Sequence, residues 1–439
     1  MKVLFLTTFD VPYEREHFFT VEVFRELAKQ PIDIVMASCI ISDEAEQINF
    51  SKSERCGRNY FVLELPQKKA HEEYIVSCLA EFFHKEKIDV VHSNMIEGYD
   101  VQACKRLNIP ICLTVHIGGL ICPRSGGNGF LRYDDTICNQ SVSKQCMRCL
   151  SNNLPFSGIS YQLLKTFPSW GVRILKKKLR NRQIFYLTEF FIQKTALEIY
   201  GKRLRLLQYA TLIVANRRLL HLLKMNNLHH KAKLIPHGVR ERRRLAFPPL
   251  DANTPVKFYY VGRVQYSKGL HVLLKALRGI DPSLYELHII GDAESSRKEQ
   301  RYYKNVQQLS EGLNVIFHGR VSNSSLESYV ADYHVMIHPC ICLEVYGIAI
   351  AEALSMGRPV LATRCGGAEM QVKDGFNGWL VMPNQIIEMK NILIHIIKNK
   401  HEMHDFAHCA GLPHNIEDYA RQFVSIYEEI TDHHQANAN

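Results

Sequence analysis

The sequence predicts an α/β protein of two domains, each built on a parallel sheet that is wrapped by helices. Short apolar segments alternate with helical stretches, which is the pattern of parallel sheets with helical connections. A basic, proline-containing segment breaks this alternation, which then restarts with the same design. The chain also has 439 residues, which is too long for one ordinary hydrophobic core.

The first domain is predicted to span residues 1–240. Its first strand is Val3–Thr7, because the N-terminus is too short and too soon polar for a signal peptide, and the helix Glu16–Lys29 follows. Between residues 118 and 207 the alternation is interrupted by a cysteine-bearing loop, 118–157, and a basic helical segment, 161–207. The remaining strands are predicted at Asp33–Ser38, Phe61–Leu65, Asp89–His92, Ile111–Val115, Thr211–Ala215 and Lys233–Ile235.

Residues 241–255 are predicted to form the linker, because they combine an arginine run with Pro248-Pro249. The second domain is predicted to span residues 256–410, and residues 411–439 carry a final helix with apolar residues along one face. The strands of the second domain are expected at Phe258–Val261, Leu287–Ile290, Asn314–Phe317, His334–Ile337 and Val360–Thr363, with helices between them such as Gly269–Arg278 and Ser324–Ala331.

Composition and charge narrow the classes of function. Hydrophobic residues make up 46% of the chain and charged residues 22%, which is ordinary for a soluble globular protein. No apolar run reaches the roughly 18 residues that a bilayer-spanning helix needs. The 13 cysteines, without an export signal, favour reduced thiols in the cytosol. A net charge of +10 suggests an anionic partner: nucleotide phosphates, an acidic membrane face or nucleic acid.

Two acids, Glu344 and Glu352, lie eight positions apart and flank a glycine and a run of small apolar residues. The run ends at Gly357-Arg358-Pro359, so Glu352 is expected in a short buried helix and Glu344 in the loop before it. Gly347 would open this helix, where backbone N–H groups attract anions. Two acids beside a group of backbone amides suit a ligand that carries both hydroxyls and phosphate, and a nucleotide sugar is such a ligand. The alternative is an exposed helix with two acids, although a carboxylate among apolar residues is rarely unpaired.

Two cations follow the first strand of the second domain. Arg263 and Lys268 lie between the carboxyl end of that strand and the next helix, where ligands bind in open α/β sheets. The planar fork of arginine and the point charge of lysine both suit a pyrophosphate. The alternative is that both are solvated surface side chains.

In their order, these motifs resemble the retaining glycosyltransferases of family 4, the group 1 transferases. This resemblance implies the GT-B fold: two Rossmann-like, doubly wound parallel-sheet domains that face a central cleft, with the final helix returning to the first domain. The residues that carry the resemblance are Gly262-Arg263 with Lys268-Gly269, Gly291-Asp292, His318-Gly319-Arg320-Val321, Glu344 to Glu352, Gly366-Gly367-Ala368-Glu369 and Asp374-Gly375-Phe376-Asn377-Gly378, with weaker signals at Thr114-Val115-His116 and Pro236-His237-Gly238-Val239.

The resemblance also implies roles for single residues. Arg263 and Lys268 would neutralise the leaving diphosphate, and His116 would approach the sugar near its reacting carbon. Glu344 would hold hydroxyls of the transferred sugar, and Glu352 the ribose hydroxyls. The other donor-binding positions implied are Gly262, Tyr346, the amides of Gly347 and Ile348, and the base-reading backbone at Arg320 and Val321.

The function expected is retaining transfer of a sugar from a UDP-, GDP- or ADP-sugar to a glycan or a lipid-linked acceptor. No Asp-x-Asp motif follows a strand, so cations and amides are expected in place of a catalytic metal. One alternative is a sugar-nucleotide epimerase, which needs an acid or base at C2 of the sugar. Another is a basic, zinc-containing nucleic-acid binder, although no nucleic-acid motif is present and nucleic acid is not an expected partner.

Two features in the interrupted region suggest further partners. Cys122, Cys138, Cys146 and Cys149 include a C-x2-C pair and predict a structural zinc site, with four unbonded thiols as the alternative. The basic segment 161–207 interleaves cations with aromatic and aliphatic residues, which suits an anionic bilayer. The alternative is a helix with one solvated face and an apolar stripe that packs in the core, because such a helix would have the same sequence pattern. The expected location is therefore cytoplasmic, with peripheral contact to the inner face of a membrane.

Overall fold

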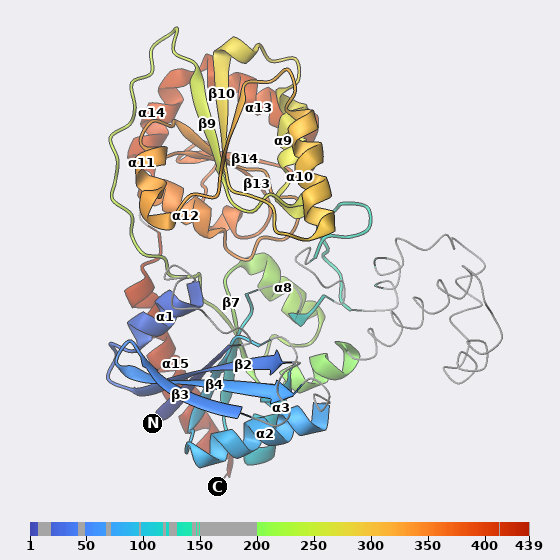
Figure 1. Ribbon diagram of the computed structural model, residues 1–439, viewed down its shortest axis with the longest axis vertical. Coiled ribbons are helices and arrows are strands. Elements are labelled where there is room, and N and C mark those ends of the chain that lie inside the picture. Colours follow the sequence, from blue (N-terminus) through green and yellow to red (C-terminus); the bar gives the residue numbers. More distant parts are fainter. Residues whose placement is uncertain are drawn as a thin grey trace, which may run out of the picture.

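Two α/β domains stack end to end in the computed structural model of the chain, and each is built on one sheet (Figure 1). This confirms the predicted fold class. The structure describes residues 1–7, 19–42, 49–66, 72–95, 98–116, 120–122, 130–142, 146, 149, 200–411 and 413–438.

The sheet of the first domain has eight strands in the order β3-β4-β2-β1-β5-β6-β7-β8. Its inner strands are short and buried on both faces, as expected where helices cover a parallel sheet. The strands are β1 (Lys2–Thr7), β2 (Asp33–Ser42), β3 (Asn49–Arg55), β4 (Arg58–Pro66), β5 (Val90–Ser93), β6 (Ile111–Thr114), β7 (Thr211–Val214) and β8 (Ala232–Leu234). The helices are α1 (Phe19–Leu27), α2 (Glu72–Lys85), α3 (Tyr99–Leu107) and α8 (Arg217–Met225).

One edge of this sheet departs from the predicted parallel design. The strands β3 and β4 pair antiparallel, whereas the other strand pairs of the sheet are parallel. A two-residue turn joins them at Cys56 and Gly57, which both have positive φ, 52° and 70°. This is the backbone of a tight hairpin turn, but a cysteine at its first position is an uncommon signal. The sequence analysis therefore missed β3.

The sheet of the second domain has six parallel strands in the order β11-β10-β9-β12-β13-β14. The strand order reverses between β9 and β12, and the loops that follow such neighbouring strands enclose the crevice where doubly wound sheets bind ligands. The strands are β9 (Val256–Val261), β10 (Tyr285–Ile290), β11 (Val315–Gly319), β12 (Val335–His338), β13 (Val360–Thr363) and β14 (Gly378–Val381). The last of these was not predicted. The helices are α9 (Leu270–Leu277), α10 (Arg297–Leu309), α11 (Leu326–Val330), α12 (Ile348–Ser355), α13 (Ile386–Lys398) and α14 (Lys400–Cys409).

The long final helix, α15 (Ile416–Ala438), lies against α1 of the first domain, so both termini lie on that domain (Figure 1). Its apolar face carries Tyr419, Phe423 and Tyr427, which are buried in one core cluster with residues of β1 and α1. The hydroxyl of Tyr427 also lies 2.6 Å from His92 Nδ1 on β5. The C-terminal helix is therefore part of the first domain's core.

The segment between the two domains runs along the second domain as extended chain (Figure 1). It is held there by two arginines. Arg358 is fully buried and donates to the carbonyl of Ala246 at 2.9 Å. Arg244 donates to the carbonyls of Ala407 at 2.5 Å and Ala410 at 3.0 Å. These hydrogen bonds fix the position at which the linker enters the second domain.

The packing of α15 predicts a large cost for truncating Phe423. Its ring is fully buried between His92, Tyr419 and Tyr427. Phe423→Ala should lower the free energy of unfolding by about 3–5 kcal/mol, because it removes buried apolar area and leaves a cavity. Denaturant titration measures this loss. Ser425→Ala, on the exposed face of the same helix, should stay within about 0.5 kcal/mol of the parent chain. Equal effects would mean that α15 is not docked.

Candidate active site

A cavity of about 720 Å³ lies between the two domains, at the point where the strand order of the second sheet reverses. The second domain contributes the loop after β9 and the loop from β12 into α12. The first domain contributes residues that follow β5 and β6. The predicted site residues that line this cavity are His116, Gly262, Arg263, Lys268, Glu344, Tyr346, Gly347 and Ile348.

The loop after β9 brings Lys268 to the cavity. A short 3-10 helix, Tyr266–Lys268, ends at Gly269, which has φ 74° and starts α9. A Cβ on this glycine would lie 1.9 Å from the carbonyl oxygen of Pro339, so only glycine lets the two loops approach this closely. Arg263 also lines the cavity, but its side chain is 54% exposed and pairs with Glu294 at 3.0 Å.

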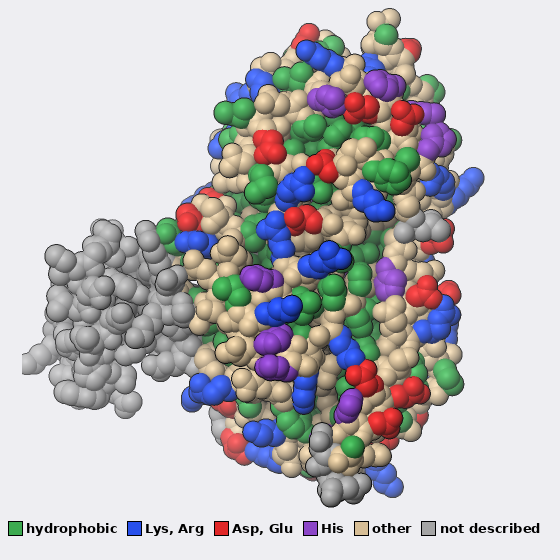
Figure 2. Space-filling model, turned by 180° about the vertical axis from the view of Figure 1, so that it is seen from behind, with side chains coloured by type: hydrophobic (Ala, Val, Ile, Leu, Met, Phe, Trp, Pro, Cys, Tyr) green, Lys and Arg blue, Asp and Glu red, His purple; other side chains and the backbone are tan. Residues whose placement is uncertain are grey.

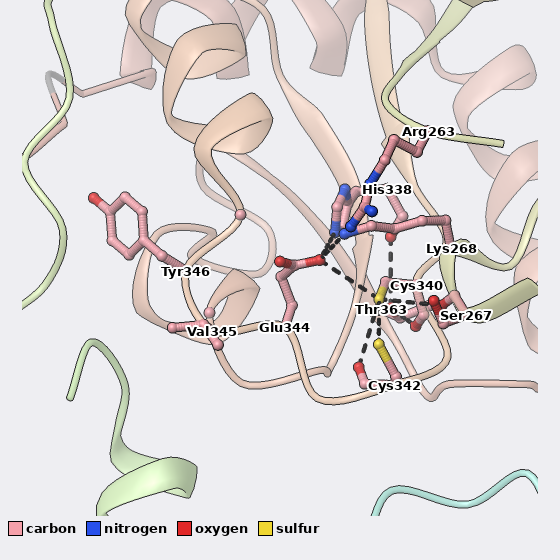
Figure 3. A network of polar contacts seen from close by, with 12 residues as sticks. Arg263, Ser267, Lys268, His338, Cys340, Cys342, Glu344, Val345, Tyr346 and Thr363 are labelled. Carbon is pink, nitrogen blue, oxygen red and sulfur yellow. Dashed lines mark hydrogen bonds and ion pairs between the residues drawn. The ribbon is translucent and has the colours of Figure 1, made fainter. Parts of the chain in front are cut away.

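Glu344 is held by an ion pair with Lys268, and its Oε2 also lies 3.4 Å from His338 Nε2. Figure 3 shows the three side chains pointing toward one another, whereas Tyr346 points away. Burial alone would raise the pKa of Glu344, but Lys268 and then His338 outweigh it and hold that pKa well below its usual value. Burial alone would lower the pKa of Lys268, but Glu344 raises it. Both side chains are therefore charged at neutral pH.

The backbone around Glu344 is held by hydrogen bonds from both domains. The Glu344 amide donates to the carbonyl of Cys365 at 2.8 Å, and its own carbonyl accepts from Gly367 at 2.9 Å. The amide of Asn216, in the first domain, donates to the carbonyls of Glu344 at 3.2 Å and Val345 at 2.6 Å. Asn216 also caps α8 and is fully buried. Sequence analysis missed Asn216, because a lone asparagine before a helix looks like an ordinary cap.

The helix α12 points its N-terminus at the cavity. Gly347 precedes it with φ 84°, and Gly347, Ile348 and Ala349 all line the cavity. The first N–H groups of a helix have no partner within it and carry a partial positive charge. The Lys268 ammonium and these amides therefore face one space, which favours an anionic ligand.

The structure places Glu352 apart from Lys268, Glu344 and the first amides of α12. Its carboxylate pairs with Arg242 at 2.7 Å, and it faces a smaller cavity of about 80 Å³. The two cavities share Phe19 and Ile348, so Glu352 lies close to the donor side but does not line the large cavity. Arg320 is exposed, and neither Arg320 nor Val321 is among the residues that line the large cavity. Only part of the predicted set is therefore brought together.

The wall of the first domain is aromatic and neutral. His116 follows β6, and its Nε2 lies 2.5 Å from Asn94 Oδ1. Its ring is 5.3 Å from that of His237, which packs 4.5 Å from Phe19 and 5.6 Å from Tyr346. Burial lowers the pKa of His116 to about 4, and burial, then the charge of His116, lower the pKa of His237. This wall therefore carries no charged histidine at neutral pH.

The four cysteines proposed as zinc ligands do not form a tight cluster in the part of the chain that is described. The charge of Cys149 acts on the thiol of Cys138. However, only His338, Cys340 and Cys365 form a described group of three or more potential ligands with ligand atoms within 4.8 Å of one another. Zinc at Cys122, Cys138, Cys146 and Cys149 stays a prediction. Most of the basic segment 161–207 lies outside the described residues.

Acid should destabilise the chain through its buried neutral histidines. Burial lowers the pKa of His116 to about 4. Burial, and then the charge of His116, lower the pKa of His92 to about 3. Below pH 6.5 the unfolded chain binds protons that the folded chain does not, so stability falls as pH falls. Each histidine contributes a slope of up to about 1.4 kcal/mol per pH unit. In urea titrations from pH 7 to pH 5, His116→Gln should show a shallower loss. An unchanged slope in the His116→Gln chain would contradict the assignment.

Comparison with known proteins agrees with this geometry. Residues 241–422 match the family model "Glycosyl transferases group 1". An uncharacterized glycosyltransferase of Methanocaldococcus jannaschii is 26% identical over 216 residues, which cover 47% of this chain and 56% of that protein. The D-rhamnosyltransferase WbpZ of Pseudomonas aeruginosa is 31% identical over 134 residues, which cover 30% of this chain and 33% of that protein. The chain therefore matches about half or less of the length of these relatives.

Two solved structures match over nearly the whole chain. Sucrose-phosphate synthase from Thermosynechococcus elongatus has a TM-score of 0.63 at 16% identity, over 98% of this chain and 99% of that one. HepE of Anabaena in complex with UDP-glucose has a TM-score of 0.59 at 17% identity, over 99% of this chain and 100% of that one. At these identities the likeness shows the fold, and the expected GT-B architecture is confirmed. Residues 241–422, which include most of the second domain, are thus similar to the group 1 glycosyl transferases, and the whole chain has the GT-B fold.

Proposed function

We propose that the chain is a retaining glycosyltransferase, which moves a sugar from a nucleotide-sugar donor to a glycan or a lipid-linked acceptor. The observation that carries this proposal is the buried Lys268–Glu344 pair beside the N-terminus of α12, at a cavity between two domains. The family match supports the reaction class. The HepE structures, which contain UDP, UDP-glucose, or UDP with glucose, support the donor class.

The donor diphosphate would lie between Lys268 and the first amides of α12. As the glycosidic bond to the phosphate breaks, negative charge develops on the leaving diphosphate. Fixed cations and helix amides stabilise such a charge without reorganising at the moment of reaction. Arg263 would join them by leaving Glu294, because a pair that is half exposed contributes little. In this proposal these groups do the work that a catalytic metal does elsewhere.

Glu344 would hold hydroxyls of the transferred sugar. Its lowered pKa keeps it ionised, so it only accepts hydrogen bonds. Its backbone is tied to Cys365 and to Asn216, and this fixes the carboxylate relative to both domains. Glu352 would receive the ribose if Arg242 turns aside, because it lies about one turn into α12, whose N-terminus faces the large cavity.

His116 would face the reacting carbon from the first domain. It is neutral, and its hydrogen bond to Asn94 fixes the plane of its ring. A neutral imidazole can donate to or accept from a sugar hydroxyl without adding charge near the oxocarbenium-like transition state. The acceptor would then enter along the wall formed by Phe19 and His237.

We propose a glycan such as lipopolysaccharide as the acceptor class, and one relative supports this choice. Among the relatives is a lipopolysaccharide 1,2-N-acetylglucosaminetransferase of Salmonella typhimurium, 29% identical over 126 residues. Lys, Arg and His side chains gather across the middle of one face of the molecule (Figure 2). Within the described residues, no helix has the length and apolar character to cross a membrane. We propose peripheral contact with an anionic membrane, made by the basic segment 161–207, in which cations alternate with aromatic and aliphatic residues.

Nucleoside diphosphates should stabilise the chain in a thermal-shift assay. One of UDP, GDP and ADP should raise the melting temperature, because the folded chain binds the diphosphate and the unfolded chain does not. At a hundredfold excess over Kd the gain is about 2.7 kcal/mol. The matching nucleoside alone should give little shift. If none of the three diphosphates shifts the melting curve, the proposed donor class is wrong.

Lys268→Ala should abolish most of the turnover. It removes a preorganised cation that faces the leaving group, and the loss of one such group costs about two to three decades in rate. Product formation from a radiolabelled donor measures the loss. Lys275→Ala, on the exposed face of α9, is the matched control and should keep parent activity. Near-normal turnover of the Lys268 variant would refute its role.

A further inference from the structure

The carboxyl ends of β12 and β13 bring three potential metal ligands together. His338 ends β12 and Cys340 lies two residues further on, whereas Cys365 lies two residues after the end of β13. The two strands pair in parallel, with His338 opposite Ala362, so the segments that follow them lie side by side. One nitrogen or sulfur atom from each of the three residues lies within 4.8 Å of the others.

The cluster is buried, and its histidine is incompletely paired. His338 is 4% exposed, and Cys340 and Cys365 are fully buried. Within the described residues, Nδ1 of His338 has no hydrogen-bond partner, and Nε2 has only the carboxylate of Glu344, 3.4 Å away. Buried nitrogen atoms without a partner are rare in folded proteins, and each calls for an explanation such as an ion or a water. A bound cation would provide that partner.

The donor set selects a thiophilic metal. One imidazole and two thiolates are typical ligands of Zn²⁺, with bonds of about 2.0–2.3 Å in a tetrahedral arrangement. Adjacent ligand atoms in such a tetrahedron lie about 3.3–3.8 Å apart. Cys342 Sγ is 3.6 Å from Cys340 Sγ, and Glu344 Oε2 is 3.7 Å from the same sulfur. Small side-chain rotations would therefore close a metal shell, with a fourth ligand already nearby.

We propose that His338, Cys340 and Cys365 form a site for Zn²⁺ or another thiophilic divalent cation. The cation would reach the site through the interdomain cavity, because His338 lines it. It would join the ends of β12 and β13 and so hold the loop that carries Glu344 (Figure 3). This site is separate from the four cysteines of the first domain. The proposal of a metal site does not depend on whether the chain transfers sugar.

Cobalt substitution tests this site on the full-length chain. Apo protein, kept reduced, is titrated with Co²⁺, whose bonds to thiolates give a near-ultraviolet charge-transfer band. To silence the other cysteine group, the titration uses the Cys146→Ser/Cys149→Ser chain. This chain should still bind about one Co²⁺, and Zn²⁺ should displace it. Adding Cys340→Ser and Cys365→Ser should abolish the band, whereas adding Cys39→Ser and Cys112→Ser, buried in the first domain, should leave it unchanged.

The outcome that overturns the proposal is an unchanged cobalt band after Cys340 and Cys365 are replaced, or no band in the Cys146→Ser/Cys149→Ser chain. A melting curve first shows whether each variant is folded. Where the Cys340/Cys365 variant does not fold, X-ray absorption of the zinc-loaded Cys146→Ser/Cys149→Ser chain decides. Two or three sulfurs at about 2.3 Å with nitrogen or oxygen at about 2.0 Å support the site. A shell of four sulfurs, or one without sulfur, contradicts it.

Discussion

The buried ion pair between Lys268 and Glu344 is the interaction on which the arrangement of the site depends. Each partner is less than one-fifth exposed, so neither charge would be stable in this place without the other. The pair joins the loop after β9 to the loop before α12, on either side of the point where the strand order reverses. It therefore holds a cation and an acid in the lining of a cavity that the N-terminus of α12 also faces.

The rest of the structure holds that pair in place relative to the first domain. Asn216 bridges from α8 to the backbone of Glu344, and Arg218 pairs with Glu369 at 2.8 Å, just beyond the turn that binds the Glu344 backbone. The helix α15 completes the core of the first domain from the end of the chain. The two domains also share apolar packing, because Leu343, Val345 and Tyr346 of the second domain belong to the same buried cluster as the core of the first domain. The loop that carries Glu344 is therefore positioned by the first domain through both polar and apolar contacts.

Much of the fold could be predicted from sequence, because the strands of parallel sheets are short apolar runs with helices between them. The elements that were missed were an edge hairpin with a Cys-Gly turn, and β14, whose sequence is short and begins with glycine. Lys268 and Glu344 were found because the charged residues lie beside glycines at fixed spacing. Spacing alone could not show that Arg242 of the linker captures Glu352, since that contact joins residues 110 positions apart. Nor could it show that Cys340 and Cys365 meet, because this requires the register of β12 and β13.

The central claim is that the cavity between the domains binds a sugar diphosphate on its second-domain side, through Lys268 and the amides of α12. A crystal structure of the chain with the nucleoside diphosphate that stabilises it tests this claim most directly. We expect the terminal phosphate within hydrogen-bond distance of Lys268 Nζ and of the Gly347 or Ile348 amide. A diphosphate bound elsewhere, with Lys268 and Glu344 still facing an empty cavity, would contradict the account.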